Sequence, residues 1–208
     1  MVKNRNPIFE KNYRDYLRQL DCCDPYLWEP VLGITVDRES KTAEIPFFKT
    51  VYRVSPSGVS DNSGKCPDYA ICVILLKYLL MCPKQVPPET EWVHSRDTGD
   101  AVQGQNDGLS AIAVKEISKR FAGGLGRLKT AVEALGGMAP QTEYPYDLSA
   151  VIMALPRIPM LFLFNDADEN FPAQATILYE RRAESFLDAE CRVMLDWRLM
   201  EFLKRPNH

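Results

Sequence analysis

The sequence predicts an α+β fold. From the N-terminus, the predicted elements run helix, strands, helix, strand, helices, strands and helix, so strands and helices cluster instead of alternating. The chain has 208 residues and is 46% hydrophobic, a composition that can bury one sizeable core. No internal repeat or long linker divides the sequence. We therefore expect a single globular domain over residues 1–208, with an antiparallel or mixed sheet packed against several helices.

The first part of the chain predicts one helix and a group of short strands. Residues 5–21 carry apolar side chains at spacings of three and four, which predicts an amphipathic helix packed on a sheet. From Val31 to about Val59 the runs VLGITVDRE, TAEIPFFK and VYRVSP are rich in β-branched and aromatic residues. Polar residues separate these runs, so we expect an antiparallel meander.

A buried central helix is expected near residues 67–81. The segment DYAICVILLKYLLMC is apolar almost all round, which is typical of a helix covered on several sides. Pro67 suits the first turn of such a helix, because its missing N–H would have no intrahelical partner there.

The second part of the chain predicts a strand, two helices, two strands and a long C-terminal helix. EWVHS indicates a short strand. A helix is expected from Ser110 to Phe121; Gly123 and Gly124 break it, and a further helix continues to Leu135. Gly136 would supply the left-handed residue that ends the second of these helices. SAVIMAL and IPMLFLF predict strands, and apolar spacing predicts the last helix over about 182–203.

Composition excludes several classes of partner. With 28 acidic and 25 basic residues the net charge is −3, which gives no basic footprint for nucleic acid. The N-terminus does not resemble a secretory signal, and the longest apolar stretch is too short to cross a bilayer. We expect a soluble cytoplasmic protein with no nucleic-acid or membrane partner. The six cysteines should then be reduced and hold no metal, since no Cys-x-x-Cys pair is present.

Three other patterns are weighed against plain structural roles. AGGLGRL lacks the Lys-Ser or Lys-Thr of a phosphate loop, so a turn between helices is the better interpretation. His94 could serve as the base of a hydrolase, but no Gly-x-Ser-x-Gly motif supplies a nucleophile. Cys66 and Cys72 would lie about 240° apart around a continuous helix, so they are not expected to share a face.

The acidic segment FNDADEN stands at the end of the predicted strand IPMLFLF. Asp166, Asp168 and Asn170 match the first, third and fifth positions of a calcium loop, but Phe171 replaces the required glycine and Ile177 the bidentate glutamate. An EF-hand is therefore excluded. Two interpretations stay open: the acids close a turn, or they bind a ligand at the strand end.

Several segments together resemble a known family, domain-of-unknown-function family 3786. The resemblance runs from about Asp68 onward and rests on DYAICVILLKYLL, EWVHSRD, the LGG after the paired helices and ALPRIPMLFLFNDADENFPAQATILYERRAESFLDAE. It implies a cytoplasmic setting and no established activity. Some members carry an iron–sulfur segment with closely spaced cysteines, and that spacing is missing here, so no cluster is expected.

Our leading hypothesis is a domain that binds a small ligand or cofactor at an acidic strand-end site. Its expected site residues are Asp166, Asp168, Glu169, Arg157, Trp92 and His94. The segment from Trp92 to Gly108 is expected to border the pocket. Two alternatives remain: a hydrolytic enzyme in which the same acids hold a cation such as Mg²⁺, and a protein-interaction module without a small-molecule site.

Overall fold

The computed structural model of the chain describes residues 7–89, 91–94 and 106–205. The helices are α1 (Pro7–Asp21), α2 (Tyr69–Leu80), α3 (Asn106–Phe121), α4 (Leu125–Ala134) and α5 (Ala189–Lys204), with short 3₁₀ or π turns at Pro25–Leu27, Trp28–Leu32 and Arg181–Ser185. The strands are β1 (Thr35–Asp37), β2 (Thr42–Phe47), β3 (Thr50–Ser55), β4 (Gly58–Ser60), β5 (Trp92–Val93), β6 (Leu148–Leu155), β7 (Ile158–Asn165) and β8 (Gln174–Glu180). The α+β class predicted from the sequence is confirmed.

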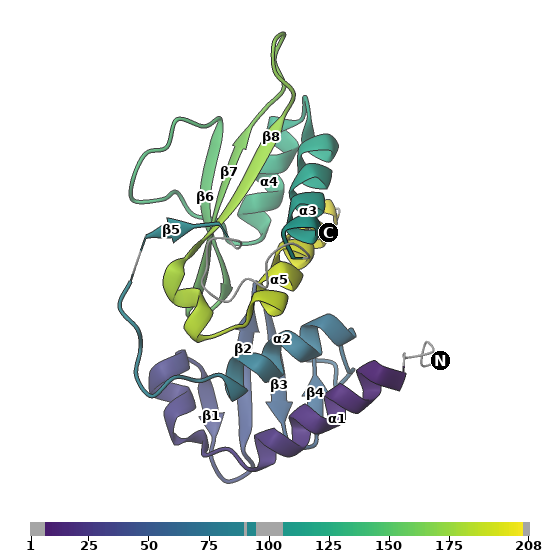
Figure 1. Cartoon of the computed structure of the whole chain (residues 1–208), viewed down its shortest axis with the longest axis vertical. Coiled ribbons are helices and arrows are strands. Elements are labelled where there is room, and N and C mark those ends of the chain that lie inside the picture. Colours follow the sequence, from purple (N-terminus) through teal and green to yellow (C-terminus); the bar gives the residue numbers. More distant parts are fainter. Residues whose placement is uncertain (1–6, 90, 95–105, 206–208) are drawn as a thin grey trace.

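Two separate antiparallel sheets replace the single sheet that was expected. The first has the order β1-β2-β3-β4 and is the predicted meander, with β4 as an additional strand. The second has the order β5-β8-β7-β6. In Figure 1 the first sheet lies at the lower end of the molecule with α1 and α2, and the second lies above it with α3, α4 and α5.

The first sheet differs from the prediction at its start. Only Thr35–Asp37 of VLGITVDRE forms a strand, because the chain before it closes a π turn at Trp28–Leu32. Gly33 ends that turn with φ of 70°, a conformation that favours glycine. Helix α1 packs mainly against α2 rather than on the sheet. Its Tyr13 hydroxyl accepts a hydrogen bond of 3.0 Å from the backbone N–H of Val59 in β4.

The central helix α2 is buried as predicted but begins later than expected. Pro67 lies outside it, and the carboxylate of Asp68 caps the helix by accepting a hydrogen bond of 3.2 Å from the N–H of Ile71. Eight of its residues are buried: Ile71, Cys72, Val73, Ile74, Leu75, Leu76, Tyr78 and Leu79.

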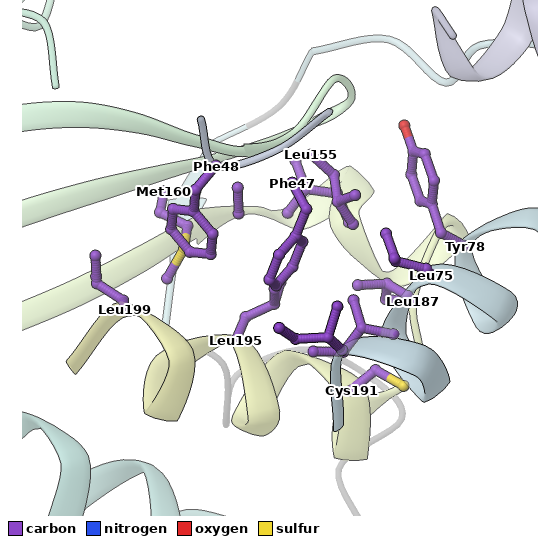
Figure 2. Packing of buried hydrophobic residues seen from close by; sticks show 14 of the residues in the cluster. Phe47, Phe48, Leu75, Tyr78, Leu155, Met160, Leu187, Cys191, Leu195 and Leu199 are labelled. Atoms are coloured by element: carbon purple, nitrogen blue, oxygen red, sulfur yellow. The ribbon is translucent and has the colours of Figure 1, made fainter. Parts of the chain in front are cut away.

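The two sheets share one hydrophobic core. Figure 2 shows Phe47 and Phe48 at the end of β2 packing among side chains from α2, from β6 and β7, and from α5. The N–H of Phe48 also donates a hydrogen bond of 2.8 Å to the carbonyl of Ala154 in β6. The halves of the molecule are therefore joined by buried apolar side chains and by the backbone.

The second sheet has one strand that the sequence analysis missed. Residues Gln174–Glu180 form β8, which pairs with both β7 and β5. The C-terminal helix expected from Arg182 instead starts at Ala189, after a 3₁₀ turn, and Asp188 caps it with a hydrogen bond of 2.9 Å from the N–H of Cys191. Helix α3 begins at Asn106 rather than Ser110, and Gly136 ends α4 with φ of 79°, as expected.

Candidate functional site

The structure separates the residues that the sequence analysis grouped into one site. Arg157 immediately precedes β7 and Asp166 immediately follows it. An eight-residue strand extends about 26 Å at roughly 3.3 Å per residue. Asp166, Asp168 and Glu169 therefore lie at one end of the second sheet, whereas Arg157 and Trp92 lie toward the other.

At the acidic end, two carboxylates bind backbone N–H groups. Asp166 accepts hydrogen bonds of 2.6 Å from the N–H of Gly123, in the α3–α4 turn, and 2.8 Å from that of Ala167. Asp168 accepts hydrogen bonds of 2.7 Å from the N–H groups of Asn170 and Phe171. These contacts are those of a side chain that closes a turn. Glu169 is exposed.

A pocket lies beside these acids. This tip pocket has a volume of about 460 Å³ and is lined by Asp147, Asn165, Asp166, Ala167, Asp168, Phe171, Pro172 and Gln174. Asp147, which the sequence analysis did not single out, accepts a hydrogen bond of 2.8 Å from the N–H of Asp166. Within the described ranges, no three His, Cys, Asp or Glu side chains come together in a way that could hold a metal ion.

At the other end, one row of side chains crosses all four strands of the second sheet. Met153 pairs with Pro159 across β6 and β7, and Glu180 pairs with Trp92 across β8 and β5. Because Met160 pairs with Tyr179, Pro159 and Glu180 are adjacent in the same row. Their neighbours in sequence point to the face covered by α3, α4 and α5, so this row lies on the opposite, outer face of the sheet.

The outer face carries a second and larger pocket. This outer-face pocket has a volume of about 570 Å³. The row of four residues and Val151 contribute to it from the sheet, and the segment after α4 contributes Met138 to Thr142 and Tyr144. Charged groups come from Glu89, Arg157, Glu180 and Arg182. The pocket thus combines an apolar sheet surface, two aromatic rings and both signs of charge.

Two of the charged groups neutralise each other. Arg182 forms an ion pair with Glu180 and lies 3.5 Å from a carboxylate oxygen of Glu89. Burial raises the pKa of Glu180, and the neighbouring Arg182 opposes that shift.

Arg157 differs from Arg182 in its partners. Its Nε donates a hydrogen bond of 2.9 Å to the carbonyl of Val31, and one terminal nitrogen donates to the carbonyl of Pro30 at 3.4 Å. These carbonyls carry no net charge. Among the residues that the structure describes, no carboxylate lies within ion-pair distance of Arg157. The described residues thus hold the Arg157 guanidinium in place without neutralising its positive charge.

The remaining expected site residues fall at the edge of this region. Trp92 is half-buried in β5 and lines the outer-face pocket. His94 follows β5, is half-buried and does not line either pocket. Residues 95–105 of the segment expected to border the site lie outside the described residues.

Comparison with known proteins identifies a family. A family model described as "Domain of unknown function (DUF3786)" matches residues 25–202. The chain belongs to this family. No curated protein and no solved structure matches the chain. None of the helices among the described residues of this DUF3786 member is long and apolar enough to span a membrane.

Sequence reasoning missed four charged or aromatic residues of the outer-face pocket in this DUF3786 chain: Glu89, Tyr144, Glu180 and Arg182. A signal for two of them was present. In QATILYE, apolar residues recur at every second position as Ala175, Ile177 and Tyr179, which is typical of a strand. Glu180 ends this strand, and Arg182 follows two residues later. Glu89 and Tyr144 lie in connecting segments, where no periodicity marks a site.

Proposed function

We propose that this DUF3786 chain binds a small organic anion in the outer-face pocket. The observation that carries the proposal is the position of Arg157, a cation on the pocket wall whose described partners are two uncharged carbonyls. An anionic group on a ligand, such as a carboxylate, would supply the negative charge that the described partners of Arg157 do not.

The shape of the pocket favours a ligand with an apolar or aromatic part. A volume of about 570 Å³ is in the range of small-molecule sites, about 300–1,000 Å³. Val151, Met153 and Pro159 offer apolar surface, and Trp92 offers a ring against which a planar group can stack. The neutralised Arg182–Glu180 pair would add hydrogen-bonding groups without adding net charge.

The tip pocket supports binding less well. Asp166 and Asp168 already accept hydrogen bonds from backbone N–H groups, so fewer of their lone pairs face a ligand. A metal-assisted hydrolase would need convergent acids, and the described residues offer no group of three.

Native mass spectrometry of freshly purified protein tests the proposal. We expect a co-purifying small molecule on the wild-type chain that is lost in Trp92→Ala and in Met153→Trp, which narrows the pocket. Phe171→Ala is the matched control, because it removes an exposed ring that lines the tip pocket instead. Loss of the molecule in Phe171→Ala but not in Trp92→Ala would place binding at the acids and overturn the proposal.

A further inference from the structure

Two cysteines that the sequence placed on different faces of a helix lie side by side. The Sγ atoms of Cys66 and Cys72 are 3.8 Å apart. The helix starts at Tyr69, so Cys66 stands before it in the segment that leads from β4, and the rotation of a continuous helix does not apply. No disulfide joins any of the six cysteines, all of which lie within the described residues.

We propose that Cys66 and Cys72 are a thiol–disulfide exchange site that low-molecular-weight disulfides oxidise to an internal disulfide. A disulfide requires Sγ atoms about 2.05 Å apart, so the two sulfurs must approach by somewhat less than 2 Å. Cys66 lies outside regular structure, two residues after the end of the turn at Asp61–Gly64, where its side chain can make that movement.

The two thiols differ in exposure, which assigns their roles. Cys66 is exposed, whereas Cys72 is buried in the first turn of α2 and its thiol contacts the carbonyl of Pro67 at 3.8 Å. An incoming disulfide can therefore reach Cys66 but not Cys72. The Tyr13 side chain lies beside both thiols, and burial together with these neighbours raises its pKa to about 12, so its hydroxyl stays neutral.

The reaction balances in two exchange steps. The Cys66 thiolate attacks one sulfur of oxidised glutathione, the glutathione S–S bond breaks, and one glutathione leaves with a proton from solvent. Cys72 then gives up its proton and attacks the Cys66 sulfur, which breaks the mixed disulfide and releases the second glutathione. The protein loses two hydrogen atoms, and the small disulfide is reduced to two thiols.

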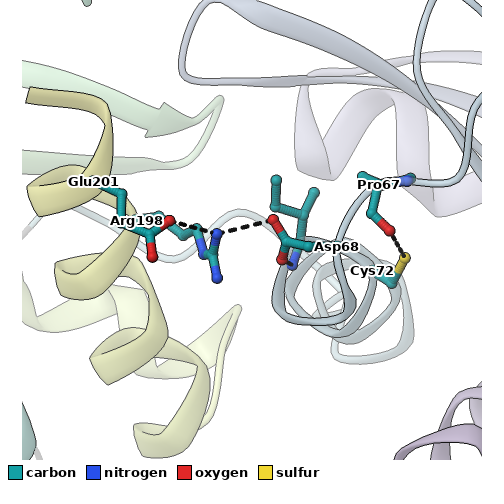
Figure 3. Close-up of polar contacts among 6 residues, drawn as sticks. Pro67, Asp68, Cys72, Arg198 and Glu201 are labelled. Carbon is teal, nitrogen blue, oxygen red and sulfur yellow. Dashed lines mark hydrogen bonds and ion pairs between the residues drawn. The ribbon is translucent and has the colours of Figure 1, made fainter. Parts of the chain in front are cut away.

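In sequence, the two cysteines flank the residue that pairs α2 with α5, and in Figure 3 Cys72 lies on the side of α2 away from α5. Figure 3 shows Asp68, which stands between the two cysteines in sequence, paired with Arg198 of α5 at 2.9 Å. Arg198 also contacts Glu201 at 2.7 Å. The internal disulfide would therefore close a loop, residues 66–72, that contains the Asp68 carboxylate of this ion pair.

The test treats the folded, reduced, full-length protein with oxidised glutathione and then alkylates the remaining thiols. Trypsin cleaves after Lys65 and Lys77, so both cysteines fall in one peptide, residues 66–77, which holds no other cysteine. We expect most of this peptide to become two hydrogens lighter and to resist alkylation, and dithiothreitol to reverse both changes.

Single variants separate the two roles. Cys72→Ser should retain glutathione on Cys66 as a stable mixed disulfide, and Cys66→Ser should retain none on Cys72. Cys22→Ser is the matched control, because it removes an exposed thiol elsewhere and should leave the result on peptide 66–77 unchanged. The proposal is overturned if wild-type peptide 66–77 stays fully alkylated, or if it carries glutathione without forming the internal disulfide; neither outcome depends on how the variants fold.

Discussion

The buried hydroxyl of Tyr78 accepts a hydrogen bond of 3.2 Å from the backbone N–H of Arg157. The same hydroxyl donates a hydrogen bond of 3.0 Å to the carbonyl of Leu32. Burial raises the pKa of Tyr78, so the proton needed for this donation is retained at ordinary pH. The Tyr78 side chain of α2 thus links two parts of the chain: the β6–β7 turn, which contains Arg157, and the segment before β1.

Replacing Tyr78 by phenylalanine should lower the free energy of unfolding by about 1–3 kcal/mol, because it leaves a buried carbonyl and a partly buried N–H without their partner. Denaturant unfolding measures the change. Tyr26→Phe is the control, since Tyr26 is 62% exposed and its change should stay within about 0.5 kcal/mol. Equal effects in the two variants would contradict the role given to Tyr78.

Truncating Leu75 to alanine should destabilise the protein by about 2–5 kcal/mol, because this fully buried side chain of α2 packs in the shared core. Leu109→Ala in α3 removes the same atoms from a side chain that is 47% exposed. We expect a much smaller loss there in the same unfolding assay. A loss under about 1 kcal/mol for Leu75→Ala would mean that α2 is not the centre of the core.

Asp196 should make stability depend on pH. It is fully buried in α5 and accepts a hydrogen bond of 2.6 Å from the Tyr179 hydroxyl and another from Ser110. Burial raises its pKa from 3.8 to about 7, while the two hydrogen bonds and the charge of Arg192 oppose the shift. Between pH 3.8 and about pH 7, Asp196 therefore holds a proton in the native state that it has lost in the unfolded state.

The contribution of Asp196 to stability is therefore greatest at low pH and is lost as pH rises toward about 7. The slope for one proton is at most about 1.4 kcal/mol per pH unit. Asp196→Asn cannot titrate, so the difference in unfolding free energy between wild type and variant should shift in favour of the variant as pH rises. A difference that stays constant between about pH 4 and pH 7 would rule out the raised pKa.

Asp166 should act as a turn-closing residue. Replacing it by alanine removes the hydrogen bonds from the N–H groups of Gly123 and Ala167, which should cost about 1 kcal/mol. Glu169→Ala is the matched control, because this neighbouring acid is exposed. If Asp166→Ala and Glu169→Ala are equally neutral in thermal unfolding, the hydrogen bonds to Asp166 do not stabilise the turn.

The elements that could be predicted are those that a short stretch of neighbouring residues is enough to define. The all-round apolarity of Ile71 to Leu79 indicated a buried helix, and Gly136 marked the end of α4. Strand β8 was missed because its short alternation lies between a proline-containing turn and a segment with helical spacing. Its inward residues, Ala175, Ile177 and Tyr179, are nevertheless all buried.

The candidate site was harder to predict because it depends on pairing between distant segments. Arg157 and Asp166 flank the apolar run IPMLFLF, and the length of that strand alone separates them. Trp92 and Glu180 meet only because β5 pairs with β8. Cys66 and Cys72 approach because Asp68, not Pro67, begins the helix as its cap.

Binding at the outer-face pocket is tested most directly by thermal unfolding of wild type, Trp92→Ala and Phe171→Ala with a panel of small organic carboxylates and phosphates. At about one hundred times its dissociation constant, a ligand should stabilise wild type by about 2.7 kcal/mol, a rise in Tm of about 5–10 °C. We predict that at least one compound raises the Tm of wild type and Phe171→Ala by this amount and leaves Trp92→Ala unchanged. A compound that stabilises Trp92→Ala as much as wild type, or a panel that stabilises none of the three, would contradict the account.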